Sequence, residues 1–208
     1  KITQDMVQKE INLFSKTLSP KSVKNIHGLI SAVLKEYNPY MTLCTKLPQK
    51  RKSDVYIPSE NDSILLLNAT QQYYKELYIP ILLACYIGLR RSEICALKWN
   101  DINFKNKTIT IRSAKVLNEN TDWIIKNPKS FAGNRTLILS NAIIDTLQRF
   151  KKENKAKKED FVIPIEPSTI TVNFSRLLSK INLPHFRFHD LRQPKVKSKT
   201  KILIYFIF

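Results

Sequence analysis

The first group of residues with chemical potential follows Gly88, in the sequence Gly-Leu-Arg-Arg-Ser-Glu. Arg90 and Arg91 stand where a glycine turn gives way to a predicted helix, and Glu93 lies in that helix's first turn. Free backbone N–H groups and the positive end of the helix dipole favour an anion at such a position. Glu93 suits the same dipole and is able to pair with an arginine and hold it. Taken alone, these residues are equally typical of a charged, solvated helix start.

Two further groups place a lysine on a turn and a histidine close to an arginine. Lys129 lies in the predicted turn 128–134 between two strands, from which a side chain can reach into a groove or an active site. His189 and Arg192 are three residues apart and share a face if the segment is helical, with Asp190 as its cap. Arginine offers a permanently charged fork to phosphate oxygens, and histidine transfers protons near neutral pH. Each group alone is a weak indication, because turn lysines are usually solvated and H-x-x-R spacing is common by chance.

The overall charge points to a polyanionic partner. The 208 residues hold 35 Lys+Arg against 17 Asp+Glu, a net charge of +18. Such an imbalance is typical of proteins that bind nucleic acid. Only 3 glycines occur, which excludes the glycine-rich phosphate loops of ATPases, kinases and dinucleotide enzymes. No Cys/His spacing suggests zinc, so neither a metal nor a cofactor is expected, and the 3 cysteines are expected to be reduced and buried.

Hydrophobic periodicity predicts an α+β fold that is mostly helical, in two parts. Residues 1–45 read as two helices, the second beginning at Ser19-Pro20, and residues 46–55 as a basic linker. Such a linker is equally a plain solvated connection or a segment that wraps over phosphates. The second part, 56–208, is expected to hold a small three-stranded antiparallel sheet formed by 107–112, 123–126 and 135–139. Its helices are expected at 60–70, 73–87, 91–98, 141–152 and 168–181.

Taken in order, the motifs G-L-R-R-S-E, P-K-S and F-H-D-L-R resemble the tyrosine recombinase (phage integrase) family. The resemblance covers residues 1–192. It implies that residues 1–45 are the C-terminal part of a helical core-binding domain, which clamps DNA together with a catalytic domain. It also implies double-stranded DNA as the partner and self-association on DNA in the intact family. The residues expected to contact DNA are basic: Lys21, Lys24, Lys50, Arg51, Lys52 and Arg91.

The same resemblance implies roles at the active site. Arg90 and Arg192 would be the catalytic arginines, Lys129 the general acid on the leaving 5′-oxygen, His189 the active-site histidine, and Glu93 a supporting residue. In this family a tyrosine oxygen attacks a DNA phosphodiester, and two arginines stabilise the charge that develops. The phosphotyrosyl ester conserves the bond energy, so strand exchange needs neither ATP nor metal.

After Arg192 the sequence departs from the family pattern. Pro194 would break the expected helix, and residues 193–208 are too few for the helices that precede and carry the nucleophile. Tyr205 is the one tyrosine of this segment, and its apolar surroundings, Ile202–Phe208, do not match the family's nucleophile. The nucleophile is therefore unassigned. We expect a chain that is truncated or frameshifted at its C-terminal side and deficient in cleavage.

The sequence thus predicts a DNA-binding integrase or site-specific recombinase of a phage or other mobile element. It would be encoded by a bacterium or a phage. A cytoplasmic location is expected because no apolar run approaches the roughly 20 residues that span a bilayer. An alternative is a non-catalytic module that binds duplex DNA and competes with an intact recombinase. A third reading, a basic RNA-binding protein, rests on charge alone.

Overall fold

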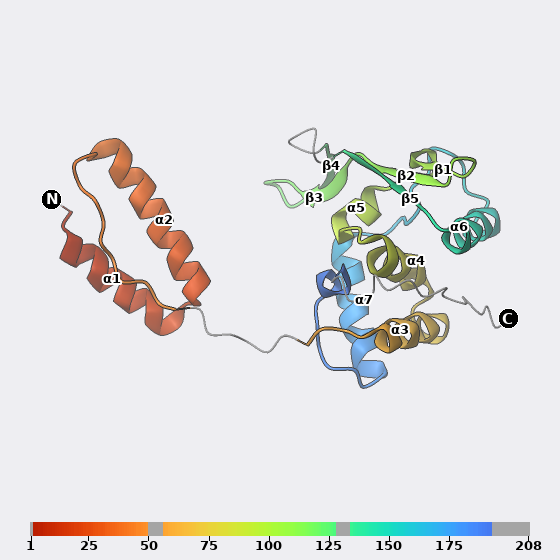
Figure 1. Cartoon of the computed structure of the whole chain (residues 1–208), viewed down its shortest axis with the longest axis horizontal. Helices are drawn as coiled ribbons and strands as arrows, with labels where there is room; N and C mark the ends of the chain where they lie inside the picture. The colour runs from red at the N-terminus through yellow and green to blue at the C-terminus, as the bar shows by residue number, and fades with distance from the viewer. Residues whose placement is uncertain (1, 50–55, 128–133, 193–208) are drawn as a thin grey trace. The chain divides into compact units, whose positions relative to one another are not determined.

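The computed structural model describes residues 2–49, 56–127 and 134–192 (Figure 1). The chain forms two compact units, Lys1–Asp54 and Val55–Phe208. The division falls inside the expected linker 46–55. Lys50, Arg51 and Lys52, which the sequence suggests as DNA contacts, lie outside the described residues, as do Lys129 and Tyr205.

The first unit contains helix α1 (Gln4–Thr17) and helix α2 (Pro20–Tyr37). Both begin as the sequence predicts, because the Thr3 hydroxyl accepts from the Met6 N–H and the Ser19 hydroxyl from the Ser22 N–H. Pro20 occupies the first turn of α2, where its missing N–H leaves no bond unmade. A small core joins the helices: Val7, Ile11 and Val23 are buried, with Phe14, Ile30, Leu43 and Leu47 packed against them.

The segment after α2 returns along α1 and completes this unit. Gln8 uses its side-chain amide to accept from the Lys46 N–H at 2.8 Å and to donate to the Lys46 carbonyl at 3.2 Å. Gln4 accepts from the Cys44 N–H at 3.1 Å in the same way. The first unit therefore extends beyond the expected boundary at residue 45. Cys44 is exposed, so the expectation of three buried cysteines is wrong for this one, whereas Cys85 and Cys95 are buried.

The second unit opens with helix α3 (Glu60–Tyr73), which Ser59 caps by accepting from the Asp62 N–H. The single helix expected over 73–87 is instead three segments: a 3₁₀ turn η1 (Lys75–Leu77), helix α4 (Tyr78–Leu82) and a π-helical turn η2 (Leu83–Ile87). Pro80 explains the division, because proline is tolerated in the first turn of an α-helix and not in its interior.

Two sheets follow rather than one. Strands β1 (Ile102–Asn103), β2 (Thr108–Ile111) and β5 (Arg135–Ile138) form an antiparallel sheet in the order β1-β2-β5. Strands β3 (Ala114–Leu117) and β4 (Trp123–Lys126) form a separate antiparallel pair. A three-stranded antiparallel sheet is present, as predicted. Its third strand is β1 and not the segment 123–126, because β1 and β5 occupy the two edges of β2. Within the described residues β4 and β5 belong to different sheets, so the expectation that 123–126 and 135–139 are strands of one sheet is wrong.

The α-helices that follow lie, with α3 and α4, below the sheets in the view of Figure 1. The further elements are α5 (Arg91–Ala96), the 3₁₀ turn η3 (Trp99–Asp101), α6 (Asn141–Glu153), α7 (Pro167–Lys180) and the 3₁₀ turn η5 (Phe188–Arg192). One core runs through the unit, and its largest fully buried side chains include Phe174, Leu66, Leu77, Leu82 and Ile109. The fold is thus α+β and mostly helical. No helix in the described part of the chain is long and apolar enough to cross a membrane.

Candidate functional site

A tight backbone corner brings Arg90 to the surface. Gly88 ends the π-helical turn with φ +74°, in the left-handed region where glycine carries no steric penalty. Its N–H donates to the Ala84 carbonyl at 3.2 Å, and the Leu89 N–H donates to the Leu83 carbonyl at 3.3 Å. Leu89 is fully buried, which anchors the corner. Arg90 follows directly at the N-cap of α5, with a side chain that is 57% exposed.

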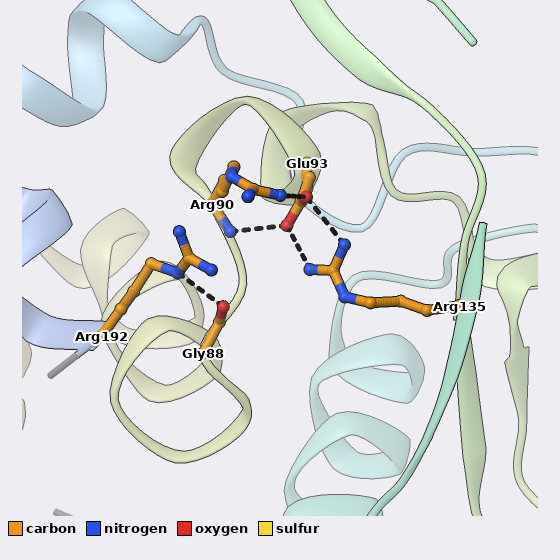
Figure 2. A network of polar contacts seen from close by, with 5 residues as sticks. All are labelled: Gly88, Arg90, Glu93, Arg135 and Arg192. Atoms are coloured by element: carbon orange, nitrogen blue, oxygen red, sulfur yellow. Dashed lines mark hydrogen bonds and ion pairs between the residues drawn. The ribbon is translucent and has the colours of Figure 1, made fainter. Parts of the chain in front are cut away.

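Glu93 is the centre of a polar network at this corner (Figure 2). One of its oxygens accepts from the Arg90 N–H at 2.7 Å, and the other from the Arg90 guanidinium at 2.8 Å. Arg135, at the start of β5, donates to both oxygens, at 2.7 and 3.0 Å. Only 7% of the Glu93 side chain is exposed. The carboxylate therefore fixes the position of Arg90 through both its backbone and its side chain.

The charge state of Glu93 follows from these contacts. Burial alone would raise its pKa, but hydrogen bonds from Arg135, from the Arg90 N–H and from the Arg90 side chain outweigh it and lower the pKa to about 2. Glu93 is consequently ionised at neutral pH and acts as an acceptor, with no proton to give.

Arg192 reaches the same corner from the other end of the unit. Its Nε donates to the Gly88 carbonyl at 2.6 Å, and its guanidinium points toward Arg90 (Figure 2). Partial burial and then the positive charge of Arg90 lower the pKa of Arg192 from its usual value. The Arg90 and Arg135 guanidinium groups thus pair with the Glu93 carboxylate, and the Arg192 guanidinium is held next to them by its bond to Gly88. Three guanidinium groups against one carboxylate leave surplus positive charge, which favours an anion.

Asp190 organises the turn that carries His189 and Arg192. It is buried and accepts from the Arg187 N–H at 2.9 Å and from the Arg187 guanidinium at 2.8 and 3.1 Å. These hydrogen bonds, led by those from the side chain, lower the pKa of Asp190. Asp190 caps the turn, as the sequence suggests. His189, on the same five-residue turn η5, is exposed to solvent.

The structure describes three of the remaining sequence-predicted residues: Lys21, Lys24 and Arg91. Lys21 and Lys24 are exposed on α2 in the first unit. Arg91 is half-buried and donates a hydrogen bond to the Thr171 hydroxyl of α7, so its guanidinium is held against a helix. Lys129 is outside the described residues, and its expected place at this site stays a prediction. In the described ranges no three His, Cys, Asp or Glu side chains gather as a metal site would require.

Arg135 is the residue that the sequence analysis missed. It was read only as the first position of a strand, and its pairing with Glu93 spans 42 residues. One sequence signal was available: Glu93 is followed by the apolar run Ile94, Cys95 and Ala96, all buried, which indicates that the glutamate itself needs partners from elsewhere.

Comparison with known proteins places this geometry in a family. The sequence profile of the phage integrase family matches residues 57–194. An XerC-like tyrosine recombinase of Caldanaerobacter subterraneus is 23% identical over 137 residues, covering 53% of this chain and 35% of that protein. The chain spans about a third of the length of the curated relatives it matches.

Two solved structures share the fold. The integrase of transposon Tn1549, in complex with transposon right end DNA, matches with a TM-score of 0.80 and 21% identity over 92% of this chain and 70% of that one. The lambda integrase bound to DNA matches with a TM-score of 0.63 and 17% identity, over 92% of this chain and 69% of that one. Since the family profile covers most of the second unit, including Gly88, Arg90, Glu93 and Arg192, the chain belongs to the phage integrase family.

Proposed function

We propose that this chain binds duplex DNA and holds one phosphodiester at the corner formed by Arg90, Arg135 and Arg192, as part of DNA integration and recombination by a mobile element. The observation that carries the proposal is the contact between the Arg192 Nε and the Gly88 carbonyl, two residues before Arg90. It brings the two motif arginines together although 102 residues separate their numbers (192 minus 90).

The chemistry follows from the charges. Attack by an oxygen on the phosphorus of a diester adds negative charge to the non-bridging oxygens in the transition state. Guanidinium groups that are already in place stabilise that charge without reorganisation. Arg192 keeps its Nη groups available because its Nε alone bonds to the Gly88 carbonyl among the described residues. Glu93, ionised and buried, holds Arg90 and offers no competing proton.

Proton transfer is assigned to two further residues. His189 is exposed on the same turn as Arg192, and its proposed role is to donate to a bound phosphate oxygen or to accept from an attacking hydroxyl. Lys129 is proposed to protonate the leaving 5′-oxygen, in keeping with the family resemblance. Both roles require the phosphate to sit at the arginine corner.

We further propose that the 208-residue chain does not form a phosphotyrosyl bond with DNA. Tyr205 lies in the apolar sequence Ile202–Phe208, which does not match the family's nucleophile. Burial raises the pKa of Tyr78 and of Tyr86, the opposite of what activates a tyrosine oxygen. A duplex with a nick beside the cleavage site, which traps covalent adducts, tests this. No adduct on a denaturing gel is expected, and an adduct that disappears in Tyr205→Phe refutes the proposal.

Salt-dependent binding tests the DNA-binding proposal. Fluorescence anisotropy with a labelled 30-base-pair duplex should give an affinity that falls steeply with salt, because bound lysines and arginines release counterions from DNA. Arg90→Gln combined with Arg192→Gln should raise Kd at least tenfold, since charge-assisted hydrogen bonds contribute about 1.5–3 kcal/mol each.

The matched control is Arg176→Gln combined with Lys180→Gln, which removes the same charge from two exposed positions of α7 that make no contact at the corner. An affinity independent of salt, or equal loss in control and double variant, refutes the proposed site. Tighter binding to structured RNA than to duplex DNA would favour an RNA-binding protein instead.

Two finer features belong to the same proposal. Lambda integrase has been solved as a tetramer bound to a Holliday junction, with a TM-score of 0.65 to this chain, and we propose self-association on DNA here as well. Binding of duplex DNA without any adduct would favour the alternative function, a module that occupies recombination sites and competes with an intact recombinase; competition with an intact recombinase for the same duplex tests it.

A further inference from the structure

A second basic site lies in a hollow between α6 and the β1–β2 turn, two elements that are neighbours in Figure 1. The hollow has a volume of about 470 Å³ and is lined by Phe104, Ala156, Gln148 and three lysines, Lys151, Lys152 and Lys155. A neighbouring hollow of about 310 Å³ shares Phe104 and Lys151 and adds Lys158. The two hollows meet at Phe104 and Lys151, and their linings together hold four lysines; we name them the α6 hollow.

The position of Lys151 in the α6 hollow is fixed by aromatic rings. Its ammonium lies 5.6 Å from the centre of the Trp99 ring and 5.7 Å from that of Phe104. The two rings stack on each other with centres 6.4 Å apart. A cation held over two ring faces is already ordered, so less entropy is lost when it binds an anion.

The positive charge of the α6 hollow is not neutralised from within the protein. None of its four lysines pairs with a carboxylate in residues 2–49, 56–127 and 134–192. Of the nearby acids, Asp101 pairs with Arg112. Glu153, Glu159 and Asp160 are exposed, and none of them forms an ion pair with these lysines in the described residues.

The helix dipole accounts for only part of this cluster. Lys151 and Lys152 lie in the last turn of α6, where cations are favourable. Lys155 and Lys158 come after the helix ends at Glu153, so the dipole does not explain them. Lys155 has φ +48°, and the next N–H, that of Ala156, donates to the Lys151 carbonyl at 3.1 Å, so the chain turns at the C-terminus of α6. The Lys158 carbonyl then accepts from the Asn100 N–H at 2.8 Å, which holds this segment against η3.

The α6 hollow is separate from the arginine corner. Strand β5 begins at Arg135, which contacts Glu93, and ends at Ile138, which pairs with Thr108. Phe104 precedes Thr108 on the β1–β2 turn and therefore lies beyond that opposite end of the sheet. Three strand steps of about 3.3 Å put the two ends of β5 about 10 Å apart before the turn is added. The phosphate held at the arginine corner cannot also occupy this hollow.

We propose that the α6 hollow binds a second stretch of DNA phosphodiester backbone. Its lysines would neutralise successive phosphates, and the exposed edge of Phe104 with Ala156 would pack against the deoxyribose carbons. This proposal rests on the proposed function only in taking DNA as the partner. The second stretch is either a distant part of the duplex held at the arginine corner or a separate duplex.

The test compares two triple variants of the full chain that lose the same charge. The hollow variant carries Lys152→Gln, Lys155→Gln and Lys158→Gln, all exposed positions, so that Lys151 keeps its contacts with Trp99 and Phe104. The control variant carries Lys9→Gln, Lys75→Gln and Lys180→Gln, which are exposed and do not line the hollow. Far-ultraviolet circular dichroism, which reports the helices of both units, verifies that both variants are folded.

Anisotropy titrations over a range of salt concentrations give the first measurement. The slope of log Kd against log salt should decrease by about 0.9 for each lysine lost from the hollow, and by far less in the control. Energy transfer between two 20-base-pair duplexes that carry different dyes gives the second. Transfer in the wild type and its loss in the hollow variant identifies a separate duplex. A decrease in the salt slope of the hollow variant that is seen with a single 60-base-pair duplex, and not with 20-base-pair duplexes, shows that the hollow and the arginine corner bind the same duplex.

The proposal is overturned if the hollow and control variants have the same salt slope and affinity on every duplex. Its failure is distinct from failure of the proposed function. If Arg90→Gln with Arg192→Gln keeps wild-type affinity while the hollow variant loses it, the arginine corner is refuted and the hollow stands.

Discussion

Replacing Glu93 by glutamine removes one charge from the centre of the arginine corner and leaves the side chain's size unchanged. In the wild type this carboxylate accepts hydrogen bonds from Arg90 and Arg135 and has a pKa of about 2, against 4.5 for an ordinary glutamate. A difference of that size corresponds to about 3 kcal/mol of folding free energy at neutral pH, since each pKa unit is worth about 1.4 kcal/mol. We expect Glu93→Gln to destabilise the second unit by about that amount at pH 7.

The pH dependence of this loss is the sharper prediction. A carboxyl whose pKa is lowered by folding stabilises the protein above its unfolded pKa, and that contribution disappears as pH falls from 4.5 toward 2. By pH 3 the linkage relation removes about 2 of the 3 kcal/mol. The variant has no proton to bind at this position, so the difference in stability between wild type and variant should shrink over the same range.

Urea unfolding followed by tryptophan fluorescence measures the difference in the whole chain. Both tryptophans, Trp99 and Trp123, lie in the second unit, and Trp99 is only 2% exposed, so the signal reports that unit alone. Other carboxyls with lowered pKa, among them Asp190, are present in both proteins and cancel in the difference.

Glu166→Gln serves as the control, because Glu166 pairs with Lys115 and its side chain is 40% exposed. This pair is partly buried, with Lys115 15% exposed, and its carboxylate is more solvated than that of Glu93, so the loss on Glu166→Gln should be smaller. A destabilisation by Glu93→Gln that stays constant between pH 7 and pH 3 would refute the assignment of the lowered pKa. A loss no larger than that of Glu166→Gln at pH 7 would refute the energetic reasoning altogether.

Two further substitutions test the corner at Gly88 and the packing of the first unit. Gly88→Ala should lower the free energy of unfolding in urea by about 1–2 kcal/mol, because φ of +74° strains any residue with a Cβ while the added methyl meets no neighbour. An unchanged unfolding midpoint would contradict the left-handed conformation of this residue. Gln8→Ala should accelerate hydrogen exchange at the Lys46 amide at least tenfold, since Gln8 is the hydrogen-bond acceptor of that amide. The control is Gln71→Ala, an exposed position of α3, and equal exchange in both variants would show that other contacts hold the segment that returns along α1.

The sequence was most informative where a structural feature depends on adjacent residues. Ser19-Pro20 and Ser59 start helices because a hydroxyl cap and a proline act within one turn, and the structure begins α2 and α3 there. Gly88 is likewise a local break, and its positive φ is the reason that a helix ends there. The family resemblance added what local pattern does not contain, namely that motifs around Arg90 and Arg192 belong together.

Features that depend on tertiary pairing were predicted incorrectly or missed. Segment 123–126 reads as a strand, yet nothing in its residues says whether it pairs with 107–112 or with 114–117, and it pairs with the latter. The segment 73–87 has the apolar content of one helix, but Pro80 forces the α-helix to restart at Tyr78. Arg135 has no local pattern at all, since its role comes from a buried carboxylate 42 residues away.

The hydrogen bond between Arg192 and Gly88 also bears on the order in which parts of the second unit fold, and on when the unit becomes able to bind DNA. It closes a loop of 104 residues, whereas the strand pairs β1–β2 and β3–β4 each close a short hairpin. Long loops form against a larger loss of chain entropy, and contacts of this separation slow folding. The scaffold around Trp99 is therefore expected to be native before the anion site exists, so that recovery of tryptophan fluorescence after dilution from urea precedes recovery of DNA binding.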